Sequence, residues 1–227
     1  MQVFNQFPSS MELEDRYGVN RRGQEEVVRQ TFYDFQNWGA SGVGVTEYSF
    51  FQVPVGQSGK TRADTNMTNA GLLPAPQKFL IQGVEIHFLS GLSPSRFNAT
   101  ASDANVNGYL DDVVAALGTT TTNVGGFLEL SIGSKPYLTE APLYRLPPKT
   151  RFKPENSIAT NAAATGFIAY DYAVSAGRPY FLDPPAFVPS MQNFKVTINF
   201  PTAVTLPSAL NARIGVVLEG LVYRLSQ

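Results

Sequence analysis

The stretch that decides the fold lies near the C-terminus, where Asn193-Phe-Lys-Val-Thr-Ile-Asn-Phe200 is followed by Arg213-Ile-Gly-Val-Val-Leu-Glu-Gly-Leu-Val-Tyr-Arg-Leu225. In the first segment, apolar residues alternate strictly with Lys195, Thr197 and Asn199, and a period of two is the signature of a half-buried strand. The second segment is apolar on both faces for most of its length, which is typical of a strand that is central in a sheet or covered on both sides. These two segments predict a β protein whose C-terminal strand is part of the core.

Working outward, the chain from Val45 onward carries the same β-type pattern. Strands are predicted over 45–53, 78–89, 127–132, 136–146, 165–174, 180–188, 193–200 and 213–225. Many short strands with Pro- and Gly-rich connections predict a single eight-stranded antiparallel jelly roll, in which two four-stranded sheets are joined by Greek keys. The alternation changes phase at Gly83, which predicts a β-bulge, and Pro142 predicts an edge strand.

Two segments have helical patterns. Between Gln24 and Trp38, apolar residues fall at i, i+4 and i+7, which predicts a short amphipathic helix. A strand over 31–36 is the alternative, because aromatic residues suit strands. A second small helix is predicted near 107–117, where two aspartates lie in the first turns. The domain prediction is an N-terminal arm with a short helix over 1–40, followed by the jelly-roll barrel over 41–227.

The chain contains one internal echo, since Pro74–Ile81 resembles Pro189–Val196 in the order Pro, two residues, Gln, one residue, Phe, one residue, β-branched aliphatic. A duplication would give a double jelly roll, which we keep as the alternative. The second copy lies too near the C-terminus for a full barrel. We therefore predict two strands that begin at the same end of one barrel and are neighbours in one sheet, with 213–225 closing the opposite sheet beside 45–53.

The composition bounds the function. Charged residues make up 15% of the chain, against about 25% in typical soluble domains. Such a surface is poorly protected against association, which favours a subunit covered by its neighbours. The net charge of −1 gives no footprint for nucleic acid over the whole chain. The absence of cysteine excludes disulfides and thiolate chemistry. The first residues lack the features of a signal peptide, and no window is long and apolar enough to span a membrane, so we expect synthesis in a cytoplasm.

The search for catalytic patterns yields little. Gly59-Lys60-Thr61 ends like a phosphate loop, but Pro54 occupies the position that requires Gly. His87 is the only histidine, so a metal site built on two histidines is excluded, and a hydrogen-bonding role is favoured. Asp103, Asn105, Asn107 and Asp111 lack the spacing of a calcium loop. The sequence therefore predicts no catalytic, cofactor-binding or metal-binding residues, no cofactor and no enzymatic activity.

The whole pattern resembles the jelly-roll major capsid proteins of tailless icosahedral viruses, bacteriophages in particular. The resemblance rests on strand order, an N-terminal arm, long loops such as Thr65-Asn-Met-Thr-Asn-Ala-Gly-Leu-Leu-Pro74, and the C-terminal strand pair. It implies a structural protein of the virion, made in the host cytoplasm, that self-assembles into an icosahedral viral coat. Its expected partners are other copies of itself and other virion proteins, with no small-molecule substrate. Basic residues Arg21 and Arg22 on the arm suggest contact with an internal membrane or the genome.

A second hypothesis is a lectin-like or receptor-binding spike domain on the same scaffold. It predicts exposed aromatic residues at loop tips, and the candidates are Tyr109, Tyr137, Tyr144 and Tyr180.

Overall fold

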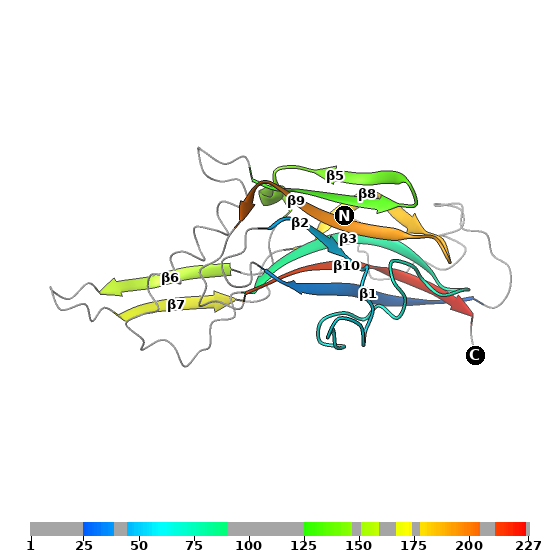
Figure 1. The fold of residues 1–227 in the computed structure, drawn as a ribbon, viewed down its shortest axis with the longest axis horizontal. Coiled ribbons are helices and arrows are strands. Elements are labelled where there is room, and N and C mark those ends of the chain that lie inside the picture. The colour runs from blue at the N-terminus through cyan, green and yellow to red at the C-terminus, as the bar shows by residue number, and fades with distance from the viewer. Residues whose placement is uncertain are drawn as a thin grey trace, which may run out of the picture.

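The protein is a two-layer β-sandwich, seen in a computed structural model (Figure 1). The structure describes residues 25–38, 45–89, 125–146, 151–158, 167–173, 178–204 and 212–225. Over this part of the chain it contains no α-helix, and one 3₁₀ turn spans Leu143–Arg145. The strands are β1 (Glu25–Asn37), β2 (Val45–Phe50), β3 (Lys78–Leu89), β4 (Phe127–Ile132), β5 (Lys135–Glu140), β6 (Arg151–Ile158), β7 (Phe167–Ala173), β8 (Tyr180–Val188), β9 (Phe194–Val204) and β10 (Arg213–Leu225).

Eight of these strands form two antiparallel four-stranded sheets, and the predicted all-β jelly-roll class is confirmed. One sheet has the order β1-β10-β3-β8 and the other β2-β9-β4-β5. The chain passes from one sheet to the other at every connection except the β4–β5 hairpin, which is the jelly-roll pattern. Strands β6 and β7 pair with each other in a separate sheet, drawn beyond one end of the sandwich in Figure 1. The described residues therefore form one barrel-like sandwich and a satellite hairpin.

The inner faces of both sheets build one core. Phe79, Ile81, Val84, Ile86 and Phe88 of β3 all lie in it, and the list spans a change of phase between Ile81 and Val84. The pairing with β10 is shifted at the same place, because Glu219 pairs with Gly83 while Gly220 pairs with Ile81. This is the bulge predicted from the phase change. The prediction that the C-terminal strand is central is also confirmed, since β10 lies between β1 and β3.

The predicted helix between Gln24 and Trp38 is wrong, because Glu25–Asn37 is strand β1, paired with β10 along its whole length. The strand alternative over 31–36 lies inside it. Phe32 is buried against the core, while Phe35 lies on the outer face. With aromatic residues on both faces, the period of two was hidden, and the helical spacing arose by coincidence. Consequently β1 belongs to the sandwich, not to an arm; the helix predicted near 107–117 lies outside the described residues.

Missing β1 also made the predicted strand neighbours wrong. Strand β3 lies in the sheet of β10, whereas β9 lies in the other sheet beside β2, so the strands that begin after Pro74 and Pro189 are not neighbours. Likewise β10 does not lie beside β2. Omitting the first strand placed β2, β3, β4 and β5 one position too early in the jelly-roll order, and this gave β9 and β10 the wrong neighbours. The count of eight survived because β7, which lies outside both sheets, was counted in its place.

Other predictions stand in part. The two Pro-terminated loops do lie at the same end of the sandwich, where the N–H of Met191 donates to the carbonyl of Leu73 at 3.0 Å and Leu72 forms a bridge with Asn193. The strand predicted over 136–146 is an edge strand, as expected, but β5 already ends at Glu140.

Candidate functional site

The lysine of the phosphate-loop-like stretch serves a structural purpose. Lys60 lies on the loop that joins β2 to β3, and its ammonium group contacts the carboxylate of Asp34 on β1. Only 13% of the Lys60 side chain is exposed, and Asp34 is fully buried. A lysine held in this way is not available to a phosphate group. This fits the reading of the stretch as a polar loop between strands.

The single histidine lies on the outer face of the β1-β10-β3-β8 sheet. His87 Nε2 is 3.0 Å from Glu85 Oε2 on the same strand, and its ring meets Phe35 of β1 edge-on at 5.8 Å. Both His87 and Glu85 are mostly shielded from solvent. The arrangement holds one imidazole in place beside a carboxylate, in keeping with the hydrogen-bonding role predicted for it.

Among the residues that the structure describes, no three histidine, cysteine, aspartate or glutamate side chains cluster in a way that could hold a metal ion. The loose calcium-loop residues between 103 and 111 lie outside these ranges. Over the described part of the chain, no helix is long and apolar enough to cross a membrane.

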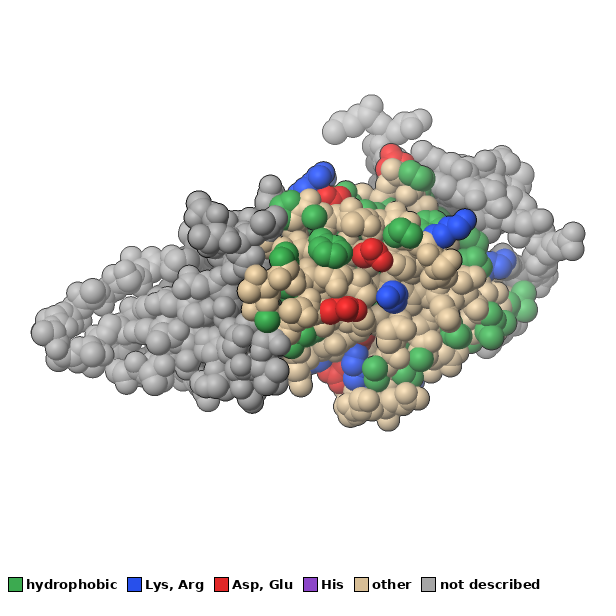
Figure 2. All heavy atoms as spheres, turned by 45° about the horizontal axis from the view of Figure 1, so that its top comes forward, with side chains coloured by type: hydrophobic (Ala, Val, Ile, Leu, Met, Phe, Trp, Pro, Cys, Tyr) green, Lys and Arg blue, Asp and Glu red, His purple; other side chains and the backbone are tan. Residues whose placement is uncertain are grey.

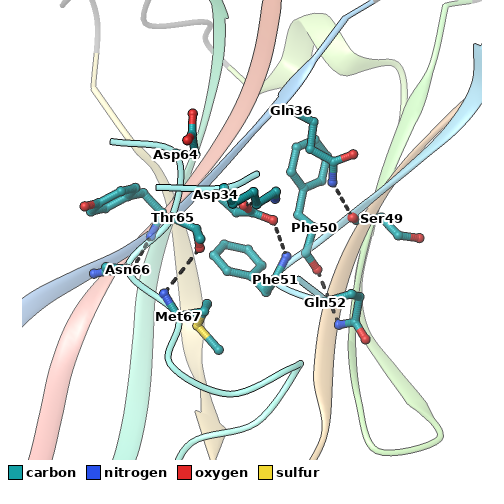
Figure 3. Close-up of polar contacts among 12 residues, drawn as sticks. Asp34, Gln36, Ser49, Phe50, Phe51, Gln52, Asp64, Thr65, Asn66 and Met67 are labelled. Carbon is teal, nitrogen blue, oxygen red and sulfur yellow. Dashed lines mark hydrogen bonds and ion pairs between the residues drawn. The ribbon is translucent and has the colours of Figure 1, made fainter. Parts of the chain in front are cut away.

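The polar residues that the fold does bring together close the two sides of the sandwich, which we call the seams. The first seam joins β1 to β2 around Asp34. Its carboxylate accepts a hydrogen bond from the backbone N–H of Phe51 at 2.6 Å, besides the contacts with Lys60 and Thr65. On the same strand, the Gln36 amide donates to the carbonyl of Ser49 (Figure 3). Burial raises the pKa of Asp34 above its ordinary value, because desolvation outweighs the stabilising hydrogen bonds and the charge of Lys60.

The free edge of β1 is covered by the loop over 51–77, which lies against it in Figure 1. The side chain of Asn66 imitates a neighbouring strand: its Oδ1 accepts from the N–H of Tyr33 at 3.1 Å, and its Nδ2 donates to the carbonyl of Thr31 at 2.8 Å. The carbonyl of Asp64 accepts a further backbone N–H of β1 at 2.7 Å. Between Thr31 and Phe35 the backbone groups of this edge are therefore occupied and cannot recruit another strand.

Asp64 also anchors this loop to the C-terminal strand. Its carboxylate accepts from the N–H of Thr61 at 2.7 Å and pairs with Arg213 of β10. These contacts, the Thr61 N–H first and the Arg213 charge after it, hold the pKa of Asp64 below its ordinary value. The Arg213 guanidinium lies 5.7 Å from the ring centroid of Phe35. The loop is therefore tied to two neighbouring strands of the sheet.

The second seam joins β5 to β8 on the opposite side. The hydroxyl of Tyr180 donates to Glu140 Oε2 at 2.6 Å, and Arg145 Nη1 lies 3.0 Å from Glu140 Oε1. The hydrogen bond to Glu140 raises the pKa of Tyr180, since the neutral phenol is the donor. The half-buried Tyr180 therefore links the edges of the two sheets on this side of the sandwich.

The remaining edges are protected by proline and charge. Strand β8 carries Pro184 and Pro185, and β5 begins with Lys135 and Pro136. Proline has no N–H to donate, and a lysine at an edge opposes strand pairing. The carbonyl of Ser49 on β2 is occupied by Gln36 of the first seam. In the described residues, all four sheet edges thus carry a device against strand addition.

The outer faces of the two sheets differ in character. The outer face of β2-β9-β4-β5 is largely polar, with hydrogen bonds between residues two apart on one strand, from Ser131 Oγ to Glu129 at 2.8 Å and from Asn199 Nδ2 to Thr197 at 3.2 Å. The outer face of β1-β10-β3-β8 holds a second apolar cluster, apart from the core, formed by Leu80, Leu221 and Tyr223 with Val27 and Phe187 packed against them. Figure 2 shows a surface on which charged side chains are scattered among uncharged polar and apolar ones.

Large apolar side chains are also exposed. Tyr137, Phe181, Met191 and Leu225 each expose more than half of their surface. Of the tyrosines predicted at loop tips, Tyr137 is exposed but lies on β5, and Tyr180 is taken up by the second seam. The Tyr144 side chain and the whole of Tyr109 lie outside what the structure describes.

Comparisons with protein-family models, curated proteins and solved structures found no match to this chain.

Sequence reasoning missed both seams. A signal existed at Asp34, because an aspartate between aromatic residues, in Phe32-Tyr-Asp-Phe35, is an unusual neighbour for a buried strand. Its partner Lys60 could not be identified, since the pairing depends on how the loop over 51–77 folds back on β1. Glu140 and Tyr180 gave no local signal.

Proposed function

We propose that this chain is a capsid subunit that self-assembles into an icosahedral virus shell. The observation that carries the proposal is the single jelly roll itself, with strand orders β1-β10-β3-β8 and β2-β9-β4-β5. Jelly rolls serve chiefly as viral capsid proteins, lectins and cupins. With a single histidine in the whole chain, the histidine-rich metal site of a cupin cannot form. A capsid subunit or a lectin-like domain remains.

The surface favours the capsid subunit. Charged residues are scarce, and four large apolar side chains among the described residues are more than half exposed. Such a surface promotes association. Because the sheet edges are protected against strand addition, association would use faces and loop ends, as fits a closed shell in which each copy contacts several others.

Electron microscopy and sedimentation velocity of the purified protein test the proposal. We expect particles of uniform size, or regular oligomers that convert to particles as protein concentration or ionic strength rises. A protein that sediments as a monomer over the whole range, with no particles on the grid, would contradict it. Expression together with the other proteins of its own genome would show whether further virion components are required.

The alternative, a lectin-like or receptor-binding spike domain, is supported by one observation. Tyr137 is 55% exposed on β5 beside Lys135 and Thr139, at the border of the polar outer face. An exposed aromatic ring near hydrogen-bonding groups suits a glycan. A glycan array distinguishes the two functions: binding that Tyr137→Ala abolishes while Arg29→Ala, on β1 of the other sheet, does not would favour the spike domain over the capsid subunit.

A further inference from the structure

The outer apolar cluster (Val27, Leu80, Phe187, Leu221 and Tyr223) sits where a two-layer sandwich normally meets solvent. Its members alternate with core residues: Leu80 lies between two core side chains of β3, and Leu221 and Tyr223 flank Val222. They therefore point away from the core. Nevertheless Leu80 is fully buried and Tyr223 is 1% exposed. A flat sheet face cannot shield its own side chains to this extent, so the cluster requires a covering layer.

The register places the cluster at one end of the sheet. Val27 pairs with Tyr223, while Leu80 pairs with Leu221 on one side and Phe187 on the other. Strand β1 begins at this end and β10 finishes there. The connections 39–44, 90–124 and 205–211, and those around β6 and β7, join the sandwich at the opposite end. Of the segments outside the described residues, only 1–24 and the dipeptide 226–227 join at the end that holds the cluster.

Residues 1–24 have the composition that a cover needs. They contain Val3, Phe4, Phe7, Met11 and Leu13, and no Lys or Arg lies among residues 3–13. The segment joins β1 only two residues before Val27, which is itself part of the cluster. At about 3.3 Å per residue it could extend roughly 80 Å, about twice the length of the longest strand in the sheet. The dipeptide 226–227 is Ser-Gln and is too short and too polar for this role.

We propose that residues 1–24 of the same chain form a third layer that covers the outer apolar cluster. Phe4 and Phe7 are the two phenylalanines that this segment offers for the contact. This inference goes beyond the capsid proposal and does not rest on it, because the cover is intramolecular and exists in a single folded chain. It gives the N-terminal segment a partner within its own subunit, before any contact with a neighbour, a membrane or a genome.

The cysteine-free sequence allows a direct test on the full-length chain. The variant Phe187→Cys places one thiol at the border of the cluster, and its rate of reaction with a maleimide reports how well the cluster is covered. Adding Phe4→Ser and Phe7→Ser is expected to raise this rate about tenfold or more, because the cover loses two large apolar side chains. The matched control adds Asn5→Ser and Gln6→Ser and leaves the rate unchanged. A second reporter, Thr139→Cys on the other sheet, stays unaffected in both backgrounds.

If Phe187→Cys reacts at the same rate in the serine variant and in its control, residues 1–24 are not the cover and the proposal falls. A second measurement identifies whose segment it is. Cysteines introduced one at a time at Phe4, Phe7 and Met11, each with Phe187→Cys, are oxidised in a mixture of isotopically heavy and light protein. Disulfides within one chain support the proposal, whereas heavy–light disulfides would show that a second copy supplies the cover and would overturn it. Monomeric protein gives the same readout as assembled protein, so the result is independent of shell formation.

Discussion

The buried pair of Asp34 and Lys60 gives the sharpest test of how the first seam is held. The Asp34 side chain has no exposed surface, and the Lys60 side chain is 13% exposed. Lys60→Met keeps an apolar chain of similar length but leaves a buried carboxylate without its counter-charge. Removing one partner of a buried ion pair typically costs about 3–5 kcal/mol. Because Lys60 retains some access to water, we expect the lower end, so the free energy of unfolding at pH 7 falls by about 3 kcal/mol.

The partner substitution Asp34→Asn is expected to be milder. The amide oxygen can still accept the N–H of Phe51, and the Lys60 ammonium group can turn toward solvent. A lost charge-assisted hydrogen bond of this kind costs about 1.5–3 kcal/mol. The double variant no longer contains a buried charge without a partner, so its cost should be smaller than the sum of the two by about 1–2 kcal/mol.

The pH dependence has a definite sign. Burial raises the pKa of Asp34 in the folded protein above its value in the unfolded chain. The folded state therefore binds the proton of Asp34 more tightly than the unfolded chain does. The stability that this proton contributes is present at low pH and is lost as pH rises through the raised pKa. In Lys60→Met we expect the pKa of Asp34 to rise further, because the hydrogen bond and the charge of Lys60, which both lower this pKa, are gone. The variant should recover stability relative to the original protein as pH falls from 7 toward 4, and Asp34→Asn should abolish that recovery.

Urea unfolding followed by circular dichroism at pH 7 and at pH 5 measures these differences. The matched control is Arg29→Met, also on β1, which breaks the surface pair between Arg29 and Glu219 of β10. Since the Arg29 side chain is 63% exposed, its loss should cost under about 1 kcal/mol. A Lys60→Met cost as small as that of the control, or one that grows as pH falls, would refute the reasoning about the seam.

Three further predictions follow from the packing. A Cβ on Gly220 would lie 1.9 Å from a backbone carbonyl of β3, so Gly220→Ala should destabilise the protein by about 3 kcal/mol or more in the same urea assay; a loss under 1 kcal/mol would show that the bulge can relax. Tyr180→Phe removes the hydrogen bond to Glu140, and this should lower the free energy of unfolding by about 1 kcal/mol. Because the pKa of Tyr180 is raised in the folded protein, the original protein should lose stability above pH 10, and the variant should not show this loss. An alkaline stability profile that is the same in both proteins would argue against the second seam. Phe181→Arg, at a side chain 63% exposed, should impair particle formation without lowering the thermal midpoint, whereas Thr139→Arg should affect neither, and equal effects on assembly would argue against an apolar contact at β8.

The fold class was predictable because most strands carry their period of two in consecutive residues. In β9, every second residue from Phe194 to Phe200 lies in the core. The bulge at Gly83 was likewise visible as a local change of phase. Strand β1 was not predicted because Phe32 and Asp34 face inward while Tyr33 and Phe35, which are also aromatic, lie on the outer side. A pattern with large side chains on both faces does not identify the inner one.

The neighbour relations failed for a different reason. Which strand pairs with which is a global property, and in a jelly roll each strand's place depends on the strands before it. One missed strand therefore placed β2 and β3 one position too early and gave β9 and β10 the wrong neighbours, while the boundaries of β3, β9 and β10 were almost correct. The contacts of the seams are harder still to predict from the sequence, because they join residues far apart in the chain. Glu140 and Tyr180, for example, are 40 residues apart.

The outer apolar cluster shows why function is harder to infer than fold. In the sequence, Leu221 and Tyr223 make β10 apolar on both faces, and this predicts burial on both faces. The pattern records that a side chain is removed from water, but not whether the covering residues belong to the same chain or to another copy. For the proposed capsid subunit this distinction decides what each face does, since a face covered from within stabilises the subunit, whereas a face covered by another copy would be a contact within the shell. The exposed Phe181 and the buried Tyr223 lie on the same sheet. Tyr223 is already shielded from water, whereas Phe181 would be shielded only by a partner, so the two side chains have different roles although they lie on one sheet.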